Sequence, residues 1–205
     1  MLQPLQNFST QPWMLADGGA LDVDACPDCW ERNAHLERYD LAARALGGMH
    51  LIDFGCGVGY GAEMLAAAGC VVVAVDLSAE ALGLARKRRA GCASFVAPGS
   101  NLLNAPFGGV VAFEVIEHLD DPLSFMGWAA QRARHVLLSV PVVPTVTTNP
   151  YHRTDFTQES FRQLISSQFA IRSEWFQTMP LQATPAVMIV HAENLRPDLI
   201  LESPE

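Results

Sequence analysis

Positive charge is scarce in this 205-residue sequence, which has 13 lysine and arginine residues against 22 aspartate and glutamate residues and a formal net charge of −9. An acidic protein is a poor electrostatic match for a phosphate backbone or an anionic membrane surface. We therefore expect neither nucleic acid nor a membrane as the partner. One basic run, Arg86 to Arg89, stands out, and we interpret it as a solvated helix end.

Long apolar runs are also lacking. No stretch approaches the roughly 20 consecutive apolar residues that a transmembrane helix requires. The first ten residues, MLQPLQNFST, have neither the basic nor the apolar region of a secretory signal peptide. These two absences favour a cytoplasmic protein.

The cysteine pattern of a structural zinc site is incomplete in this sequence. The five cysteines include one Cys-x-x-Cys pair, Cys26 and Cys29, and no second pair follows it. A structural zinc site usually takes four protein ligands. We interpret the pair as two reduced thiols where a helix begins.

The remaining sequence alternates between helical and strand patterns. After an irregular, proline- and glycine-containing lead-in over 1–28, a single domain is predicted over 29–205. Ser78 and Thr157 are expected to cap helices. Helices are predicted at 30–46, 60–69, 79–89, 121–133 and 158–169, and strands at 50–54, 70–77, 93–98, 109–115, 135–141, 171–179 and 186–194.

This order of elements predicts an α/β fold with a doubly wound, Rossmann-like, seven-stranded sheet. Alternating strands and helices form parallel sheets because each crossover helix returns the chain to the same edge. The last two strands are joined by a connection too short for such a crossover. We therefore expect a mostly parallel sheet with one antiparallel strand near the C-terminus.

A glycine-rich loop follows the first predicted strand in the stretch LIDFGCGVGYG, residues 51–61. Glycine weakens strands and helices, so its repetition indicates that the backbone approaches something closely. Ligands of doubly wound sheets bind at the carboxyl ends of the strands. Asp76 ends the second strand, where a carboxylate can accept both hydroxyls of a ribose, and the two features together predict a nucleoside-containing cofactor.

Asp53 indicates which nucleoside. It precedes Gly55 by two residues, where a carboxylate would repel a pyrophosphate and attract a cation. S-adenosylmethionine carries a sulfonium and an ammonium group, so Asp53 favours this cofactor over a nicotinamide dinucleotide.

At this point the sequence resembles a known family. Residues 51–82, LIDFGCGVGYGAEMLAAAGCVVVAVDLSAEAL, resemble motif I and the following strand of class I S-adenosylmethionine-dependent methyltransferases. The segments FEVIEHLDDPLSF and SVP…NPYHRTDFTQESFRQLI extend the resemblance to the small, ubiquinone-methyltransferase-like (type 11) branch. The resemblance covers about residues 35–177.

The resemblance implies cofactor contacts residue by residue. Asp53 would organise the methionine amino group, Asp76 would bind the ribose, and Leu77 would pack on the adenine. Ser100 or Asn101 would face the adenine edge, where relatives often carry an acid. The full set implied for the cofactor is Asp53, Gly55, Cys56, Gly57, Gly59, Asp76, Leu77, Ser100, Asn101 and Glu114.

Two departures from the family pattern concern the fourth and fifth strands. Phe-Asp at the fourth strand is replaced by Phe107-Gly108, and the Pro-Gly-Gly turn before the fifth strand is replaced by QRARH, residues 131–135. Both changes look structural rather than chemical. They nevertheless motivate an alternative, a cofactor-binding protein that has lost methyl transfer and acts as a regulator or partner subunit.

Four residues are candidates for the acceptor side of the site, where the molecule that receives the methyl group would bind: Glu114, Glu117, His118 and His152. Transfer from a sulfonium needs alignment above all, and an oxygen or nitrogen acceptor can also need a base. The motif E-x-x-E-H also resembles the metal-binding forms of some ubiquinone-pathway and small-RNA 3′-terminal 2′-O-methyltransferases. We favour a metal-free acceptor site or base, and we keep a divalent metal site and a purely bracing role open.

Other chemically notable residues have simpler interpretations. His35 and Tyr39 on the first helix, and Trp128 and Trp175, are expected mainly to pack in the core. The proline-rich loop over 141–156 suits a segment that covers a substrate, and disorder without ligand is an equal alternative.

The sequence therefore predicts an S-adenosylmethionine-dependent methyltransferase with a small-molecule acceptor, most consistent with O-methylation. The inactive regulator is the main alternative, and a metal-dependent RNA 2′-O-methyltransferase and an NAD(P)-dependent oxidoreductase are weaker ones.

Overall fold

A seven-stranded sheet in the order β3-β2-β1-β4-β5-β7-β6 runs through the protein. The structure, a computed structural model, describes residues 15, 21–26, 28–180 and 183–200. The strands are β1 His50–Phe54, β2 Val71–Val75, β3 Ser94–Val96, β4 Phe107–Phe113, β5 Ala133–Pro141, β6 Phe169–Gln177 and β7 Val187–Asn194. The α-helices are α1 Trp30–Leu46, α2 Tyr60–Ala67, α3 Ala79–Arg88, α4 Pro122–Ala130 and α5 Gln158–Ser166.

The topology confirms the predicted doubly wound fold. Strands β3, β2, β1, β4 and β5 are parallel, and β7 lies antiparallel between β5 and β6. The chain returns directly from β6 to β7, as the short connection requires. The order reverses between β1 and β4, which creates the switch point where ligands bind in such sheets.

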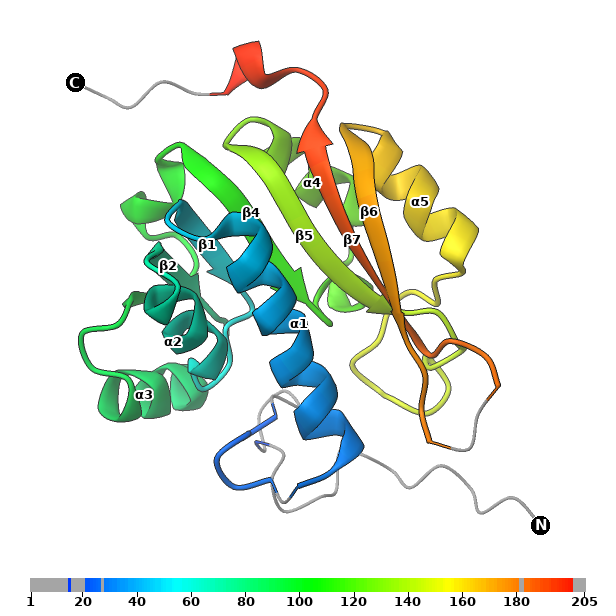
Figure 1. Ribbon diagram of the computed structural model, residues 1–205, viewed down its shortest axis with the longest axis horizontal. Helices are drawn as coiled ribbons and strands as arrows, with labels where there is room; N and C mark the ends of the chain where they lie inside the picture. Colours follow the sequence, from blue (N-terminus) through cyan, green and yellow to red (C-terminus); the bar gives the residue numbers. More distant parts are fainter. Residues whose placement is uncertain (1–14, 16–20, 27, 181–182, 201–205) are drawn as a thin grey trace.

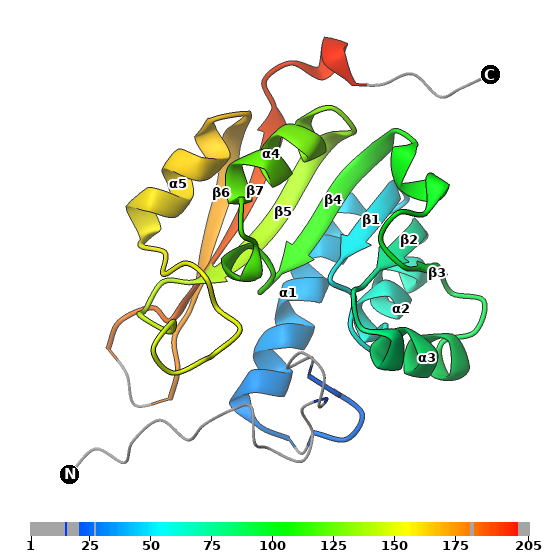
Figure 2. The same ribbon diagram turned by 180° about the vertical axis from the view of Figure 1, so that it is seen from behind.

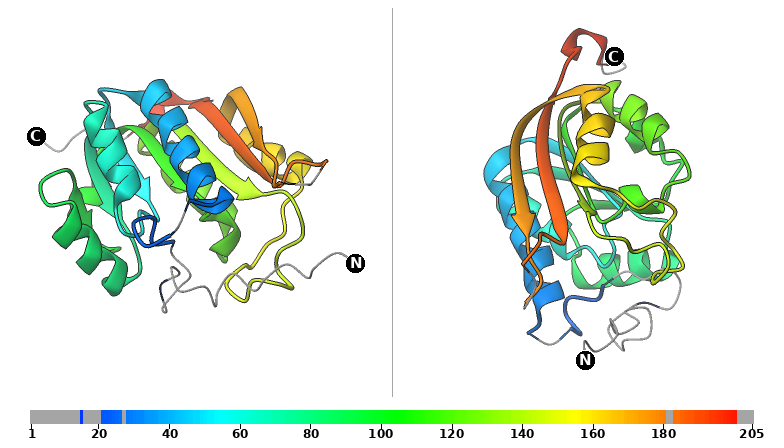
Figure 3. Two further views of the ribbon diagram at one scale, coloured as in Figure 1. Left: turned by 60° about the horizontal axis from the view of Figure 1, so that its bottom comes forward. Right: turned by 90° about the vertical axis from the view of Figure 1, so that its right-hand side faces the viewer.

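Helices cover the sheet on both faces (Figure 1). Helix α1 crosses the face that Figure 1 shows in front, with α2 beside it, and the reverse view in Figure 2 brings α4 and α5 forward. Seen along the sheet, in the right panel of Figure 3, the strands form a layer between α1 and α5. The left panel shows the segment Leu21–Cys26 and the loop after β5 at the end of the sheet that comes forward.

Each parallel strand contributes to two hydrophobic clusters. In β1, Leu51 belongs to the cluster under α1, α2 and α3, and Ile52 belongs to the cluster under α4 and α5. Successive side chains of a strand point to opposite faces, so a strand covered on both faces is apolar throughout. This is why the run at 71–75 lacks the polar alternation of a half-exposed strand.

Two predicted helix caps are present. Ser78 Oγ accepts a hydrogen bond of 2.9 Å from the Ala81 backbone N–H at the start of α3. Thr157 Oγ1 accepts one of 3.0 Å from the Ser160 N–H, and Ser160 Oγ accepts one of 2.9 Å from the Thr157 N–H, so that α5 begins with a capping box.

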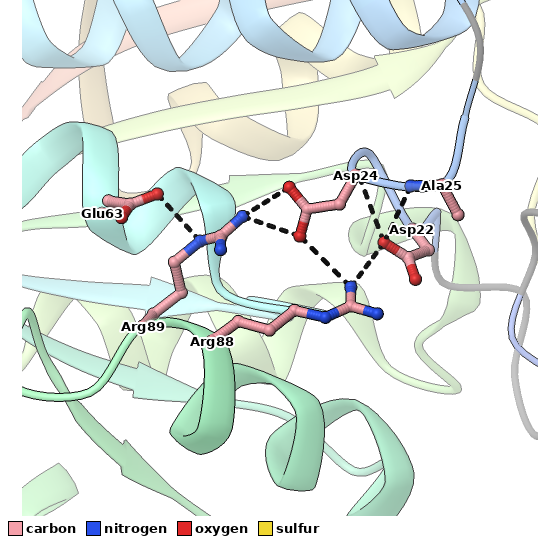
Figure 4. Close-up of polar contacts among 6 residues, drawn as sticks. All are labelled: Asp22, Asp24, Ala25, Glu63, Arg88 and Arg89. Carbon is pink, nitrogen blue, oxygen red and sulfur yellow. Dashed lines mark hydrogen bonds and ion pairs between the residues drawn. The ribbon is translucent and has the colours of Figure 1, made fainter.

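The basic run at the end of α3 is exposed at Arg86, Lys87 and Arg88, as predicted for a solvated helix end, and it also forms ion pairs. Arg88 Nη1 lies 2.8 Å from Asp22 Oδ1, and Arg89 Nη2 lies 2.7 Å from Asp24 Oδ1. Arg89 Nε also lies 2.8 Å from Glu63 Oε2 of α2 (Figure 4). Arg88 and Arg89 therefore fasten the lead-in segment Leu21–Cys26 to α2 and α3. These two residues of the basic run make tertiary ion pairs.

The two departures from the family pattern have structural explanations. A Cβ at Gly108 would lie 3.0 Å from Met49 Cβ and 3.3 Å from the His50 carbonyl oxygen, so a side chain has little room there. The turn between α4 and β5 is held by Asn194, whose Nδ2 donates to the Ala130 and Ala133 carbonyls at 2.7 and 2.9 Å. Both changes affect packing at the edge of the sheet opposite the glycine loop.

Among the described helices, none combines the length and the apolar character that crossing a lipid bilayer demands.

Candidate functional site

The glycine loop between β1 and α2 turns sharply at the carboxyl edge of the sheet. Gly55, Gly57 and Gly59 have positive φ angles of 79°, 53° and 81°. A Cβ at Gly59 would also come within 2.7 Å of the Phe95 ring, and one at Gly55 would overlap Val115. Cys56 between them is buried. The loop conformation and its close packing thus both demand glycine.

Gly61 has a different role from the one that its place in the repeat suggests. It lies in the first turn of α2, and a Cβ there would overlap the ring of Tyr39 on α1. Its backbone therefore makes room for a neighbouring helix and not for a ligand.

Asp76 organises the same loop from the end of β2. Its Oδ2 accepts a hydrogen bond of 2.8 Å from the Gly57 N–H, and its Oδ1 accepts one of 2.8 Å from the Ser78 N–H. A carboxylate oxygen has two lone pairs, so each oxygen retains acceptor capacity toward a further donor. The geometry is compatible with the predicted binding of two ribose hydroxyls.

Asp53 is buried beneath the loop. Its Oδ1 accepts a hydrogen bond of 2.8 Å from the Tyr39 hydroxyl, and its Oδ2 is buried without a hydrogen-bond partner. Burial, with the nearby charge of Asp76, raises the pKa of Asp53 to about 7, and the hydrogen bond from Tyr39 acts in the opposite direction. A positive group close to Oδ2 would supply the missing partner and stabilise the carboxylate.

Helix α1 brings a buried cation, Arg38, to the site. No sequence motif had singled out this residue. Arg38 is 2% exposed, its Nη1 donates a hydrogen bond of 2.6 Å to Gln177 Oε1, and its Nε has no partner. Arg38 occupies an i, i+4 row with Ala34, Ala42 and Leu46, all buried. A charged residue on the apolar row of a helix is the sequence signal that would have identified it.

His35 and Tyr39 do more than fill space on α1. The Tyr39 ring packs edge-on against Tyr60, whose hydroxyl lies 2.7 Å from His35 Nδ1. Burial first, and the charge of Arg38 second, hold the pKa of His35 well below its usual value, so its imidazole is neutral. The predicted packing role of His35 and Tyr39 is thus accompanied by polar links to Tyr60 and Asp53.

The residues expected near the adenine follow the carboxyl ends of β2 and β3. Leu77 is 88% exposed, so its apolar side chain is accessible to a planar ligand. Ser100 caps the short 3₁₀ turn Asn101–Asn104 by accepting a hydrogen bond of 3.3 Å from the Leu102 N–H. Asn101 is exposed at the start of that turn.

Glu114 sits at the end of β4 in a strained conformation. Among the described residues other than glycine, it alone has a positive φ, 55°. Its backbone N–H donates to the Ser139 carbonyl at 3.1 Å, and its Oε1 accepts a hydrogen bond of 2.8 Å from Ser139 Oγ. Such strain persists where surrounding contacts impose it, commonly at functional sites.

Glu117, His118 and His152 come together, whereas Glu114 remains outside this group. Each of the three offers a ligand atom, and these atoms lie within 4.8 Å of one another. Glu117 is fully buried and neither of its oxygens has a hydrogen-bond partner. Burial, together with the charge of Glu114, holds its pKa well above the usual range.

Both histidines of the group are neutral. The rings of His118 and His152 meet edge to face at a centroid distance of 4.6 Å. Burial lowers the pKa of His118, and burial together with the neighbouring His118 lowers the pKa of His152 to about 4. Neutral imidazoles can accept a proton or bind a metal ion.

The loop over 141–156 is fastened to this group. The backbone N–H groups of Arg153 and Thr154 donate to the Glu117 carbonyl at 2.7 and 3.2 Å. Thr145 Oγ1 lies 2.6 Å from His152 Nδ1, and Asp155 accepts hydrogen bonds from the Thr145 and Val146 N–H groups. The loop therefore has a defined conformation that presents His152.

Two chemical environments thus meet at the carboxyl edge of the sheet. One is a glycine loop flanked by Asp53 and Asp76, which suits a positively charged nucleoside. The other is the carboxylate and two imidazoles of Glu117, His118 and His152. These nitrogen and oxygen donors, with a buried carboxylate that lacks a partner, also fit a divalent cation.

Comparison with known proteins identifies the family. The profile of a family described as a methyltransferase domain matches residues 31–189, most of the chain. The ubiquinone biosynthesis O-methyltransferase of Aromatoleum aromaticum is 35% identical over 100 residues, which cover 43% of this chain and 41% of that protein. A probable S-adenosylmethionine-dependent methyltransferase of Mycobacterium tuberculosis is 28% identical over 161 residues, covering 71% of this chain and 56% of that protein.

The chain thus spans about half the length of these curated relatives. Among solved structures, magnesium protoporphyrin IX methyltransferase from Synechocystis with bound S-adenosylmethionine superposes with a TM-score of 0.65, over 84% of this chain and 88% of that chain, at 19% identity. This likeness supports the fold. The match over residues 31–189 shows that the chain belongs to the methyltransferase domain family.

Proposed function

We propose that this methyltransferase transfers a methyl group from S-adenosylmethionine to an oxygen atom of a small molecule. The observation that carries the proposal is the buried Asp53 carboxylate, whose Oδ2 lacks a partner directly below the glycine loop. A cationic cofactor supplies the charge that this oxygen lacks, whereas a pyrophosphate would be repelled.

The cofactor pose follows from the charges around the loop. Asp76 would accept the ribose hydroxyls while its bond to Gly57 keeps the loop in place. Asp53 would hold the methionine ammonium, and Arg38, a buried cation with an unpartnered Nε, would hold the methionine carboxylate. Leu77 would cover the adenine, and Asn101 would offer an amide to its edge.

The acceptor side needs to hold and deprotonate a hydroxyl group. The methyl group leaves the sulfonium sulfur as the acceptor oxygen forms its new bond, and the hydroxyl proton passes to a base. His118 and His152 are neutral and can take this proton, and Glu117 and Glu114 orient the acceptor. The products are the methyl ether and S-adenosylhomocysteine.

The class of acceptor is inferred from charge and from the relatives. The net charge of −9 disfavours a nucleic acid substrate. The A. aromaticum relative is a ubiquinone biosynthesis O-methyltransferase, and its likeness lies in less than half of that protein. A hydroxylated small molecule is therefore the acceptor that we propose.

A divalent cation at Glu117, His118 and His152 is a second proposal, favoured by one specific observation. Both oxygens of a fully buried carboxylate lack partners while two neutral imidazoles stand beside it. A bound cation would satisfy the carboxylate and would polarise an acceptor hydroxyl.

The decisive experiment has a binding arm and a transfer arm. Calorimetry with S-adenosylhomocysteine should give binding to the unaltered protein and its loss in Asp76→Ala, with Asp198→Ala, on an exposed turn, as the control. Transfer from methyl-labelled S-adenosylmethionine is then assayed over phenols, alcohols, amines and carboxylic acids, with chelator and with Mg²⁺ or Mn²⁺. Activity confined to hydroxylated acceptors supports the proposal. Binding without transfer to any acceptor would favour the inactive regulator instead.

A further inference from the structure

Cys26 and Cys29 approach each other where the lead-in segment meets α1. Their Sγ atoms are 3.0 Å apart. Cys26 is buried and Cys29, the residue just before the first turn of α1, is half-buried. The sulfur atoms of a disulfide are about 2.05 Å apart, so a movement of about 1 Å would allow a bond to form.

The surroundings of the pair do not make it a metal centre. Among the residues that the structure describes, the group of three or more histidine, cysteine or carboxylate ligands that could hold an ion is the one at Glu117. A soft metal held in a structural site usually takes four such ligands. Two thiols that face each other without further ligands are instead suited to exchange with a disulfide.

A small reactant can reach the pair from solvent. An open hollow of about 730 Å³ is lined by Val23, Asp24, Cys26, Asp28, Arg32 and Asn33. Burial first, and the adjacent Cys29 second, raise the pKa of Cys26 to about 12, so Cys26 stays protonated near neutral pH. Cys29 is the less buried of the two residues and is therefore the one that we expect to attack an incoming disulfide.

We propose that Cys26 and Cys29 form a reversible intramolecular disulfide by exchange with a low-molecular-weight disulfide such as glutathione disulfide. The Cys29 thiolate attacks one sulfur of glutathione disulfide and expels one glutathione thiolate, which takes up a proton. Cys26 then loses its proton and attacks Cys29 Sγ, and the second glutathione leaves. The protein loses two electrons and two protons, and glutathione disulfide becomes two glutathione thiols.

The bond would join two differently anchored parts of the chain. The segment Leu21–Cys26 is held to α3 by the Asp22–Arg88 and Asp24–Arg89 ion pairs (Figure 4). Cys29 begins the helix that carries Arg38 and Tyr39 into the site. Oxidation therefore acts at the junction between an ion-paired surface segment and a helix of the site.

The proposal is tested by counting thiols. The full chain is equilibrated in glutathione buffers of increasing oxidised fraction, quenched with an alkylating reagent and weighed by mass spectrometry. We expect two of the five thiols to disappear together, with a mass decrease of two hydrogen atoms in the peptide that contains Cys26 and Cys29, and their complete return on reduction.

Three variants separate this outcome from general thiol reactivity. Cys26→Ser should convert Cys29 to a mixed disulfide with glutathione, Cys29→Ser should leave the remaining four thiols free, and Cys92→Ser should behave as the unaltered protein. Binding of S-adenosylhomocysteine verifies that each variant is folded. Five free thiols at the most oxidising ratio, a disulfide between two chains, or oxidation at Cys56, Cys70 or Cys92 would overturn the proposal.

Discussion

The Tyr39 hydroxyl donates a hydrogen bond of 2.8 Å to Asp53 Oδ1, and thereby joins α1 to the end of β1 beneath the glycine loop. Both side chains are buried. Tyr39 packs against Phe113 of β4, and the charge of Asp76, which follows β2, helps to raise the pKa of Asp53. The two residues are 14 positions apart in the sequence, and only the packing of α1 on the sheet brings them together.

Removal of this hydroxyl should weaken cofactor binding. In Tyr39→Phe, Asp53 loses the hydrogen bond that lowers its pKa, so its charged form becomes less stable. We expect a loss of about 1 to 2 kcal/mol in the binding of S-adenosylhomocysteine, measured by calorimetry. Tyr60→Phe is the control, because that hydroxyl contacts His35 and not a carboxylate. Equal affinities for Tyr39→Phe and the unaltered protein would contradict this prediction.

Cofactor affinity should rise with pH through neutrality. The pKa of Asp53 is about 7 in the folded protein, and the charged form attracts the cationic cofactor. We expect the affinity for S-adenosylmethionine to rise about tenfold from pH 6 to pH 8 and then to level off. The pKa of His35 lies well below its usual value, so His35 stays neutral in this range. A flat profile in Asp53→Asn would assign the dependence to Asp53, whereas a persisting slope would assign it elsewhere.

The same pKa makes stability depend on pH in the opposite direction. The folded-state value of about 7 lies above the ordinary value of 3.8, so the folded state holds its proton more tightly than the unfolded state does. The contribution of Asp53 is fully present below about pH 4 and is lost as pH rises to about 7. In urea titrations without cofactor, the stability advantage of Asp53→Asn over the unaltered protein should therefore grow across this interval. An advantage that is constant with pH would refute the assignment.

Two helical glycines should respond oppositely to alanine. A Cβ at Gly61 would overlap the Tyr39 ring, whereas a Cβ at Gly83 in α3 meets no atom within 4 Å. Gly61→Ala should lower the free energy of unfolding by about 1 to 3 kcal/mol through overpacking, and Gly83→Ala should raise it by about 0.5 to 1 kcal/mol. Thermal and urea denaturation measure both variants, and a neutral Gly61→Ala would show that α1 and α2 can move apart.

The ion pairs of the lead-in segment should contribute modestly and should respond to salt. Asp24→Ala removes one of the two acidic partners of Arg89, whose side chain is 12% exposed, and leaves Glu63 in place. We expect a loss of about 0.5 to 1 kcal/mol in 0.05 M salt and a smaller loss in 1 M salt. The control is Asp198→Ala, which breaks an exposed contact with Arg196 and should have almost no effect. Faster proteolysis near Leu21–Cys26 in Asp24→Ala alone would be consistent with the fastening role.

The local pattern of residues was sufficient to predict most of the fold. The five helices, seven strands, two caps and the antiparallel β7 all follow from periodicity, capping and connection length, because these depend on neighbours along the chain. The glycine loop with Asp53 and Asp76 could be predicted from the sequence for the same reason, because the loop and the strand ends beside it are short, continuous segments.

The tertiary structure alone decided the contacts between distant segments. Arg38 is buried against Gln177, 139 positions away, and Arg88 and Arg89 form ion pairs with Asp22 and Asp24 of the segment Leu21–Cys26. Glu114 accepts a hydrogen bond from Ser139, and Glu117 groups with His118 and His152 without it. Periodicity reports which face of an element is buried, but it contains no information about which distant side chain will lie opposite. The sequence by itself therefore determined the fold and the cofactor loop, whereas the arrangement of the acceptor side depended on how the elements pack.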